Sequence, residues 1–84
     1  MSLKYYKMEL SIKYFGLLAE ITGLEEERLN IENKKIGGLI DTIIKKYPAL
    51  KGRSFKIAQN KKMVNKEDLV NGEEIALLPP FSGG

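Results

Sequence analysis

The chain has 84 residues, of which 43% are hydrophobic, and it carries a formal net charge of +3. This length predicts a single domain over residues 1–84 that is just large enough to bury a core of its own. The absence of cysteine and histidine excludes disulfides, thiolate nucleophiles and imidazole general bases. We therefore expect no catalysis by this chain alone, and no metal or cofactor bound by it.

The charge pattern argues against a nucleic-acid partner. The basic residues are scattered in short runs, and residues 25–27, all glutamate, interrupt them, whereas a nucleic-acid site needs lysine and arginine clustered on one face. The pattern is typical of an ordinary charged surface, with one face biased positive to meet an acidic partner. No run approaches the ~20 apolar residues of a membrane span, and a cytoplasmic location follows by default.

The first half of the chain predicts a strand, a short helix and a second strand. Residues 7–15 alternate polar and apolar, which indicates a half-buried strand. Its apolar side consists of Met8, Leu10, Ile12 and Tyr14. Helical spacing follows from Leu17 to Ile21, and Gly23 suits a helix C-cap. Residues 28–31 predict the second strand, in which Leu29 and Ile31 alternate with polar residues.

A long central helix gives the clearest periodic signal. Its apolar residues recur at i, i+3, i+4, i+7 and i+8, which is typical of a helix with one buried face. They are Ile36, Leu39, Ile40, Ile43, Ile44 and Tyr47. Pro48 ends the helix, since proline disfavours helical angles in the residue before it. Gly37 and Gly38 cost about 1 kcal/mol each relative to alanine, so this stripe must be stabilised by packing in the core.

The second half predicts three short strands. Residues 55–59 alternate as a strand that turns at Asn60-Lys61 and returns through residues 63–64. Residues 65–69 predict a single helical turn, and Asn71-Gly72 a tight turn. The last strand spans residues 73–78, with Ile75 and Leu77 on its apolar side.

The C-terminus ends in two glycines, and two prolines precede them by a short interval. Gly83 and Gly84 lack a Cβ, so they can enter a channel too narrow for any side chain. Pro79 and Pro80 end the strand and project the last four residues in an extended conformation. Residues 81–84 span at most ~13–14 Å at ~3.3–3.6 Å per residue. We expect residues 79–84 to form a flexible tail that presents the terminal carboxylate to the active site of another protein.

This order of elements resembles the ubiquitin-like β-grasp fold, an α+β fold in which a mixed sheet of about five strands wraps one main helix. Here a short extra helix follows the first strand. Residues 12–23, the turn at 71–73 and residues 74–84 together look like the MoaD-type small subunit of molybdopterin synthase. The resemblance covers essentially the whole chain from about Lys7, and the strand followed by Pro-Pro-x-Ser-Gly-Gly is its most specific part.

The resemblance implies a sulfur carrier of molybdenum cofactor biosynthesis. A ubiquitin-activating-type adenylyltransferase, using ATP and Mg, would adenylate Gly84, and sulfur from a separate sulfurtransferase would displace AMP to leave a thiocarboxylate. The large subunit of molybdopterin synthase, which holds the catalytic lysines and arginines, would use this sulfur on cyclic pyranopterin monophosphate. Gly84 is then the sulfur-bearing residue and Gly83 the clearance residue. Four residues would set the direction and the reach of the C-terminal tail: Pro79, Pro80, Phe81 and Ser82.

Strand alternation predicts a docking surface for these partners. If the apolar side of the first strand faces the helix, Phe15 faces the other way, and by the same rule Leu78 faces outward on the last strand. We expect Met63 and Phe81 close to them. An apolar cluster outside the core marks a protein contact, and the family uses this sheet face to bind both partners. The alternative is that Phe15 packs on the short first helix.

Other functions share this fold and tail. The chain would serve a different pathway as a thiamine or tRNA-thiolation sulfur carrier, or would form isopeptide bonds from Gly84 as a ubiquitin-like modifier. A nucleic-acid-binding module is a third class, with steep salt dependence and no need for Gly84. The short helix after the first strand and the Pro-Pro-Phe-Ser approach favour molybdopterin.

Overall fold

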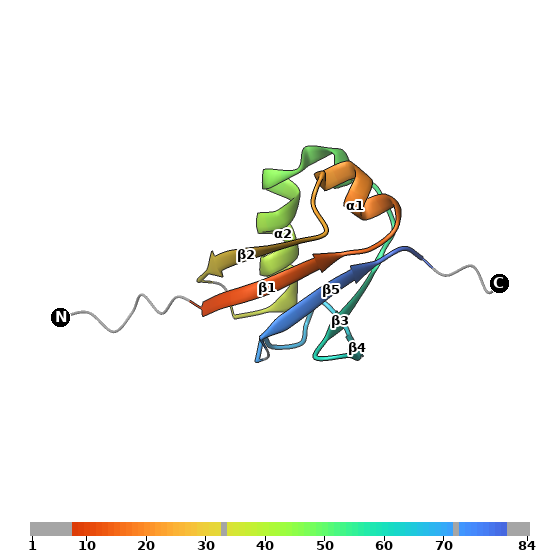
Figure 1. Cartoon of the computed structure of the whole chain (residues 1–84). Helices are drawn as coiled ribbons and strands as arrows, with labels where there is room; N and C mark the ends of the chain where they lie inside the picture. The colour runs from red at the N-terminus through yellow and green to blue at the C-terminus, as the bar shows by residue number, and fades with distance from the viewer. Residues whose placement is uncertain (1–7, 33, 72, 81–84) are drawn as a thin grey trace.

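The computed structural model describes residues 8–32, 34–71 and 73–80 (Figure 1). The predicted order of strands and helices is confirmed in this part of the chain. The elements are β1 (Met8–Tyr14), α1 (Leu17–Thr22), β2 (Glu26–Ile31), α2 (Ile36–Lys46), a 3-10 turn η1 (Pro48–Leu50), β3 (Lys56–Gln59), β4 (Lys62–Val64) and β5 (Glu74–Leu78). None of the described helices has the length and apolar character needed to cross a membrane.

The five strands form one mixed sheet in the order β2-β1-β5-β3-β4. β1 and β5 lie side by side and parallel, with Ser11 opposite Glu74 and Tyr14 opposite Leu77 (Figure 1). All other neighbouring strands are antiparallel. The last strand therefore lies beside the first, and both strands end on the same side of the sheet. This arrangement confirms the β-grasp fold expected from the sequence.

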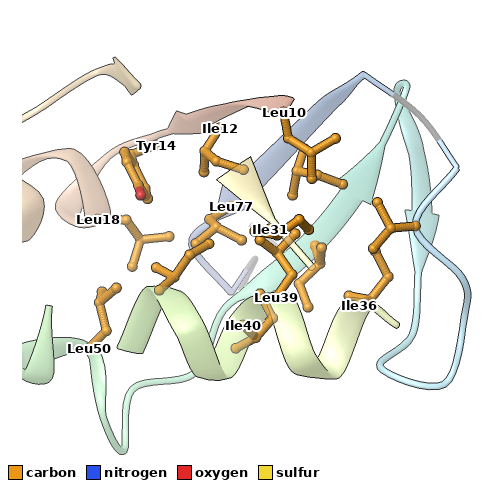
Figure 2. Packing of buried hydrophobic residues seen from close by; sticks show 14 residues of the cluster. Leu10, Ile12, Tyr14, Leu18, Ile31, Ile36, Leu39, Ile40, Leu50 and Leu77 are labelled. Atoms are coloured by element: carbon orange, nitrogen blue, oxygen red, sulfur yellow. The ribbon is translucent and has the colours of Figure 1, made fainter. Parts of the chain in front are cut away.

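The core lies between one face of the sheet and α2. Four helix residues, Ile36, Leu39, Ile40 and Ile43, are at most 1% exposed, and they are part of the predicted stripe. Figure 2 shows the side chains of Leu10 and Leu77 directed from the sheet toward this helix. Burying each such side chain fully contributes roughly 1.5–3 kcal/mol. The stripe is therefore core, as expected, with Ile44 and Tyr47 packed at its margin.

The ends of both helices agree with the sequence signals. The N–H of Gly23 donates to the Ala19 carbonyl over 2.8 Å, which caps α1. α2 ends at Lys46, and Tyr47, with φ −128° and ψ 81°, lies outside the helical region that proline disfavours in the residue before it. Pro48 then starts η1, whose Leu50 is fully buried.

The prediction of a helical turn over residues 65–69 is wrong. The segment forms one tight turn, in which the N–H of Asp68 donates to the Asn65 carbonyl and the Asp68 carboxylate accepts from the Asn65 N–H. Its backbone then pairs with the start of α2: Ile36 N–H donates to the Asp68 carbonyl and Gly37 N–H to that of Lys66, each over 2.9 Å. These tertiary bonds satisfy N–H groups that a helix leaves free in its first turn, and they replace the local helical pattern.

The hairpin turn between β3 and β4 is where the sequence places it. Asn60 and Lys61 form the two-residue loop, with φ of 50° and 72°. Two positive φ values are typical of the type I′ turn that matches strand twist. Gly72, half of the second predicted turn, lies outside the described residues.

Candidate functional site

The base of the tail lies where β1 and β5 end. Pro79 and Pro80 follow β5 as exposed, irregular chain, and the Phe15 N–H donates to the Leu77 carbonyl over 3.1 Å. This bond carries the β1–β5 pairing up to the first proline. The remaining tail residues, Phe81, Ser82, Gly83 and Gly84, lie outside the described residues.

Gly16 fits the turn after β1 closely against the base of the tail. Its backbone has φ 59° and ψ −134°, a conformation that L side chains rarely adopt. A Cβ at this position would lie 2.8 Å from Cγ of Pro79, well inside van der Waals contact. Glycine is therefore required here for both backbone angle and space, and it lets the turn hold the first tail residue in place.

Phe15 and Leu78 lie on the outer face of the sheet, on neighbouring strands. The β1–β5 register pairs Tyr14 with Leu77, so Phe15 and Leu78 are the next pair along. Phe15 is 44% exposed, and Leu78 is partly exposed. Phe15 therefore lies outside the core cluster, and it lines a surface pocket together with Ala19 of α1.

Met63 shares this face but is not adjacent to Leu78. The register places it opposite Ala58, which in turn lies opposite Ala76, so β3 separates Met63 from β5. Two strand spacings of ~4.8 Å put the β4 backbone ~10 Å from β5. Met63 is 58% exposed. We call Phe15, Leu78, Ala76 and Met63 the apolar patch; Ala58 lies between Ala76 and Met63 but is only 6% exposed.

Charged and polar pairs flank the apolar patch on the β1–β2 side. Lys13 Nζ lies 3.1 Å from Glu74 Oε2, and the Ser11 hydroxyl donates to Glu26 Oε2 over 2.6 Å. These groups are solvated and largely satisfied by one another, so their pairing contributes little to stability. They border the apolar patch on this side, and Lys56, which lies opposite Leu78 in the register, borders it on the other.

Behind Phe15, one carboxylate ties β1, β2 and α2 together. Glu27, whose side chain is 10% exposed, accepts hydrogen bonds from the Tyr14 hydroxyl (2.6 Å), the Tyr47 hydroxyl (2.8 Å) and Lys46 Nζ (2.6 Å). The two tyrosine rings meet edge to face, with centroids 6.0 Å apart. This cluster fixes the C-terminal end of α2 beneath the strand end that carries Phe15.

The pKa values of the cluster keep its hydrogen bonds intact at neutral pH. Burial raises the pKa of the Glu27 carboxyl, but the hydrogen bonds from Lys46, Tyr14 and Tyr47 outweigh it and leave the pKa below its usual value. Burial, followed by the bond to Glu27, raises the pKa of both tyrosine hydroxyls. Glu27 is therefore ionised and both tyrosines are protonated donors.

The variant Glu27→Gln is expected to lower the free energy of unfolding by about 1–2 kcal/mol at neutral pH, because bonds to a charged acceptor are replaced by weaker ones. A depressed pKa stabilises the fold above the unfolded carboxyl's value of ~4.3, and this contribution is lost as the pH falls through the folded value. The difference between wild type and variant should therefore shrink in acid. Urea titrations at neutral pH and at about pH 3 measure it.

The matched control for this experiment is Glu20→Gln, which removes an exposed carboxylate on α1 and should change stability little at either pH. If the difference in free energy of unfolding between wild type and Glu27→Gln is the same in acid as at neutral pH, the ionised carboxylate of Glu27 does not have the stabilising role assigned to it.

Sequence reasoning did not single out Gly16 or Glu27. The predicted second strand began at Arg28, so Glu27 fell outside it; extending the alternation of Leu29 and Ile31 back by two residues would have placed an acid on the buried side. A glycine between a strand and a helix is a signal for Gly16, but its contact with Pro79 depends on the parallel pairing of distant strands.

No group of three metal-ligating side chains occurs within residues 8–32, 34–71 and 73–80. The site consists instead of an apolar sheet face beside the base of a glycine-ended tail. Together with the sheet order, these features define a β-grasp protein of the ubiquitin-like class. The chain belongs to the ThiS family, which matches residues 12–84.

Individual proteins resemble this chain over most of its length. The molybdopterin synthase sulfur carrier subunit of Chlamydomonas reinhardtii is 31% identical over 83 residues, covering 92% of this chain and 100% of that protein. The crystal structure of SAMP1 from Haloferax volcanii superimposes with a TM-score of 0.78 at 25% identity, over 92% of this chain and 100% of the other. A chain in the complex of subunits 1 and 2 of the molybdopterin-converting factor from Helicobacter pylori matches with a TM-score of 0.60 at 28% identity, over 92% and 100% of the two chains.

Proposed function

We propose that this chain is the sulfur carrier subunit of a molybdopterin synthase, with the carboxylate of Gly84 as the attachment point for sulfur. The observation that carries the proposal is the placement of the tail base: β5 runs parallel to β1 and passes directly into Pro79-Pro80 beside the apolar patch. A protein that binds the patch would receive the tail. Full-length similarity to a molybdopterin synthase sulfur carrier subunit supports the choice of pathway.

The terminal carboxylate must be activated before it can receive sulfur. A terminal carboxylate, with a reference pKa of ~3.3–3.7, is ionised at neutral pH and resists attack by nucleophiles. Its oxygen can attack the α-phosphorus of ATP, which releases pyrophosphate and forms an acyl-adenylate. A persulfide sulfur then attacks the acyl carbon and AMP leaves. A second thiol cleaves the resulting S–S bond, so the chain is left with a thiocarboxylate.

The residues of this chain present the tail and bind the partner. Because the chain has no cysteine or histidine, the adenylating, persulfide-bearing and sulfur-accepting groups are assigned to other proteins: an adenylyltransferase that uses ATP and Mg, a sulfurtransferase, and the large subunit. Gly83 gives the clearance that a narrow channel demands. Phe81 and Ser82, with the two prolines, set how far the terminus reaches. The large subunit supplies the catalytic groups and binds cyclic pyranopterin monophosphate.

Intact mass spectrometry tests this function. The chain is incubated with ATP, Mg, the adenylyltransferase of the same organism, a persulfide donor and a reducing thiol. We expect one oxygen to be replaced by sulfur, located on Gly84 by fragmentation, and we expect the purified product to convert cyclic pyranopterin monophosphate to molybdopterin when the large subunit is added.

Separate outcomes contradict the proposal at different levels. An unchanged mass, with an adenylyltransferase shown to be active on a known substrate, removes the sulfur-carrier role. Sulfur loading without molybdopterin formation assigns the chain to another sulfur-transfer pathway. Isopeptide conjugates to lysines of other proteins, lost when Gly84 is deleted, would show a protein modifier instead.

A further inference from the structure

A groove borders the base of the tail on the side away from the apolar patch. It has a volume of about 570 Å³ and lies between α1, the loop after η1 and the two prolines. Its apolar wall includes Leu17, which is 48% exposed, together with Pro79 and Pro80. Its other wall is formed by residues 51–54, which contribute Lys51, Arg53 and a serine hydroxyl. The groove is thus apolar along the tail and cationic opposite it.

The cationic wall is a fixed turn. The Arg53 N–H donates to the carbonyl of Leu50 over 3.1 Å, and Leu50 is fully buried in the core. Lys51 has φ −63° and ψ 132°, and Gly52 has φ 82°, which are the angles of a type II turn with glycine at its third position. The turn therefore presents Lys51 and Arg53 from a rigid base on the domain.

Within the described part of the chain, no carboxylate pairs with these two cations. Neither Lys51 nor Arg53 forms an ion pair with any residue that the structure describes, whereas Lys13, Arg28 and Lys46 each have a carboxylate within 4 Å. The described residues that line the groove include no aspartate or glutamate. Exposed unpaired cations beside an apolar wall form a surface complementary to a segment that combines carboxylates with apolar side chains.

We propose that this groove binds an acidic segment of the large subunit, next to the opening that receives the tail. The inference rests on the proposed function. The groove shares Pro79 and Pro80 with the tail base, so a protein that surrounds the tail and covers the apolar patch also reaches the groove. Lys51 and Arg53 guide the encounter by long-range attraction and orient the tail toward the opening, and the apolar patch supplies the short-range contacts.

Association kinetics with the large subunit test the groove. The double variant Lys51→Glu/Arg53→Glu is expected to bind roughly 10- to 100-fold more slowly than wild type at low salt. Wild-type association should slow steeply as salt rises, because screening acts within ~10 Å at 0.1 M, and the variant should lose this dependence. The control Lys34→Glu/Lys45→Glu makes the same change in net charge at exposed residues that do not line the groove. It should remain within about threefold of wild type.

The failures of the two proposals are distinguishable. If wild type is thiocarboxylated and binds the large subunit, but the groove variant and the control associate equally fast, the groove inference is overturned and the function stands. If wild type is not loaded at Gly84, the function itself fails. Lys51→Arg/Arg53→Lys keeps both charges and should associate at the wild-type rate; a loss as large as in the reversal variant would show that charge is not the feature recognised.

Discussion

One additional alanine after Gly84 is expected to abolish both adenylation and sulfur loading. The extra residue replaces the reacting carboxylate with an unreactive amide at Gly84, and it moves the new terminal carboxylate outward by up to ~3.6 Å. It also brings a methyl group into a channel whose proposed width admits only glycine. A displacement of this size is large for a reaction that needs reacting atoms ~3–3.5 Å apart. ATP–pyrophosphate exchange and intact mass measure the two steps.

The control for the extended chain carries the same alanine before Met1. The described residues of β1 begin only at Met8, and this change should leave loading at the wild-type level. Equal urea midpoints for the two extended chains would show that both are folded. Sulfur found on the extended chain at the wild-type rate would contradict a mechanism that depends on the Gly84 carboxylate.

The elements of the fold were predictable because their signals are local. The stripe from Ile36 to Tyr47 repeats at the helical period, and the alternation from Met8 to Tyr14 has the period of a strand. Both patterns require only that one side of the element be buried. The sheet order required the resemblance to a known fold, since alternation shows which side of a strand is buried but not which strand lies beside it.

The features that the sequence did not predict depend on contacts between distant segments. A helical turn was expected over residues 65–69, but the carbonyls of Lys66 and Asp68 accept hydrogen bonds from the first turn of α2. Glu27 becomes a buried acceptor because Tyr14 and Tyr47, 13 and 20 residues away, converge on it. The turn that presents Lys51 and Arg53 is built on the burial of Leu50 in the core. In each case the contacting residues are too far apart in the sequence for a local pattern to predict the contact.

The candidate site also combines features that the sequence predicted with features that it did not predict. Strand alternation predicted that Phe15 and Leu78 face outward together, and the register places them as neighbours. It could not predict the distance to Met63, because that depends on β3 lying between β5 and β4. The role of Gly16 against Pro79 was hidden for a similar reason: residues 63 positions apart meet only because the first and last strands are parallel.

Phe15→Asp is expected to weaken binding to the large subunit by about 2–3 kcal/mol, or roughly 30- to 150-fold in Kd, as is typical of a central aromatic contact. The side chain is 44% exposed and is not packed on the core, so unfolding free energy should change by only about 0.5 kcal/mol. Leu78→Asp should weaken binding similarly. Isothermal titration with the large subunit measures both, and circular dichroism during urea titration checks the fold.

Leu69→Asp is the matched control, because Leu69 is 60% exposed but lies on the loop that pairs with Lys35, outside the apolar patch. It introduces the same charge at a leucine that is more exposed than Phe15 and should leave Kd unchanged. Met63→Asp then measures the extent of the contact, since β3 separates Met63 from β5: a loss as large as that of Phe15→Asp means that the partner spans four strands, and a small loss confines it to the β1–β5 pair. If Phe15→Asp and Leu78→Asp both bind as tightly as Leu69→Asp, the large subunit does not use this face of the sheet.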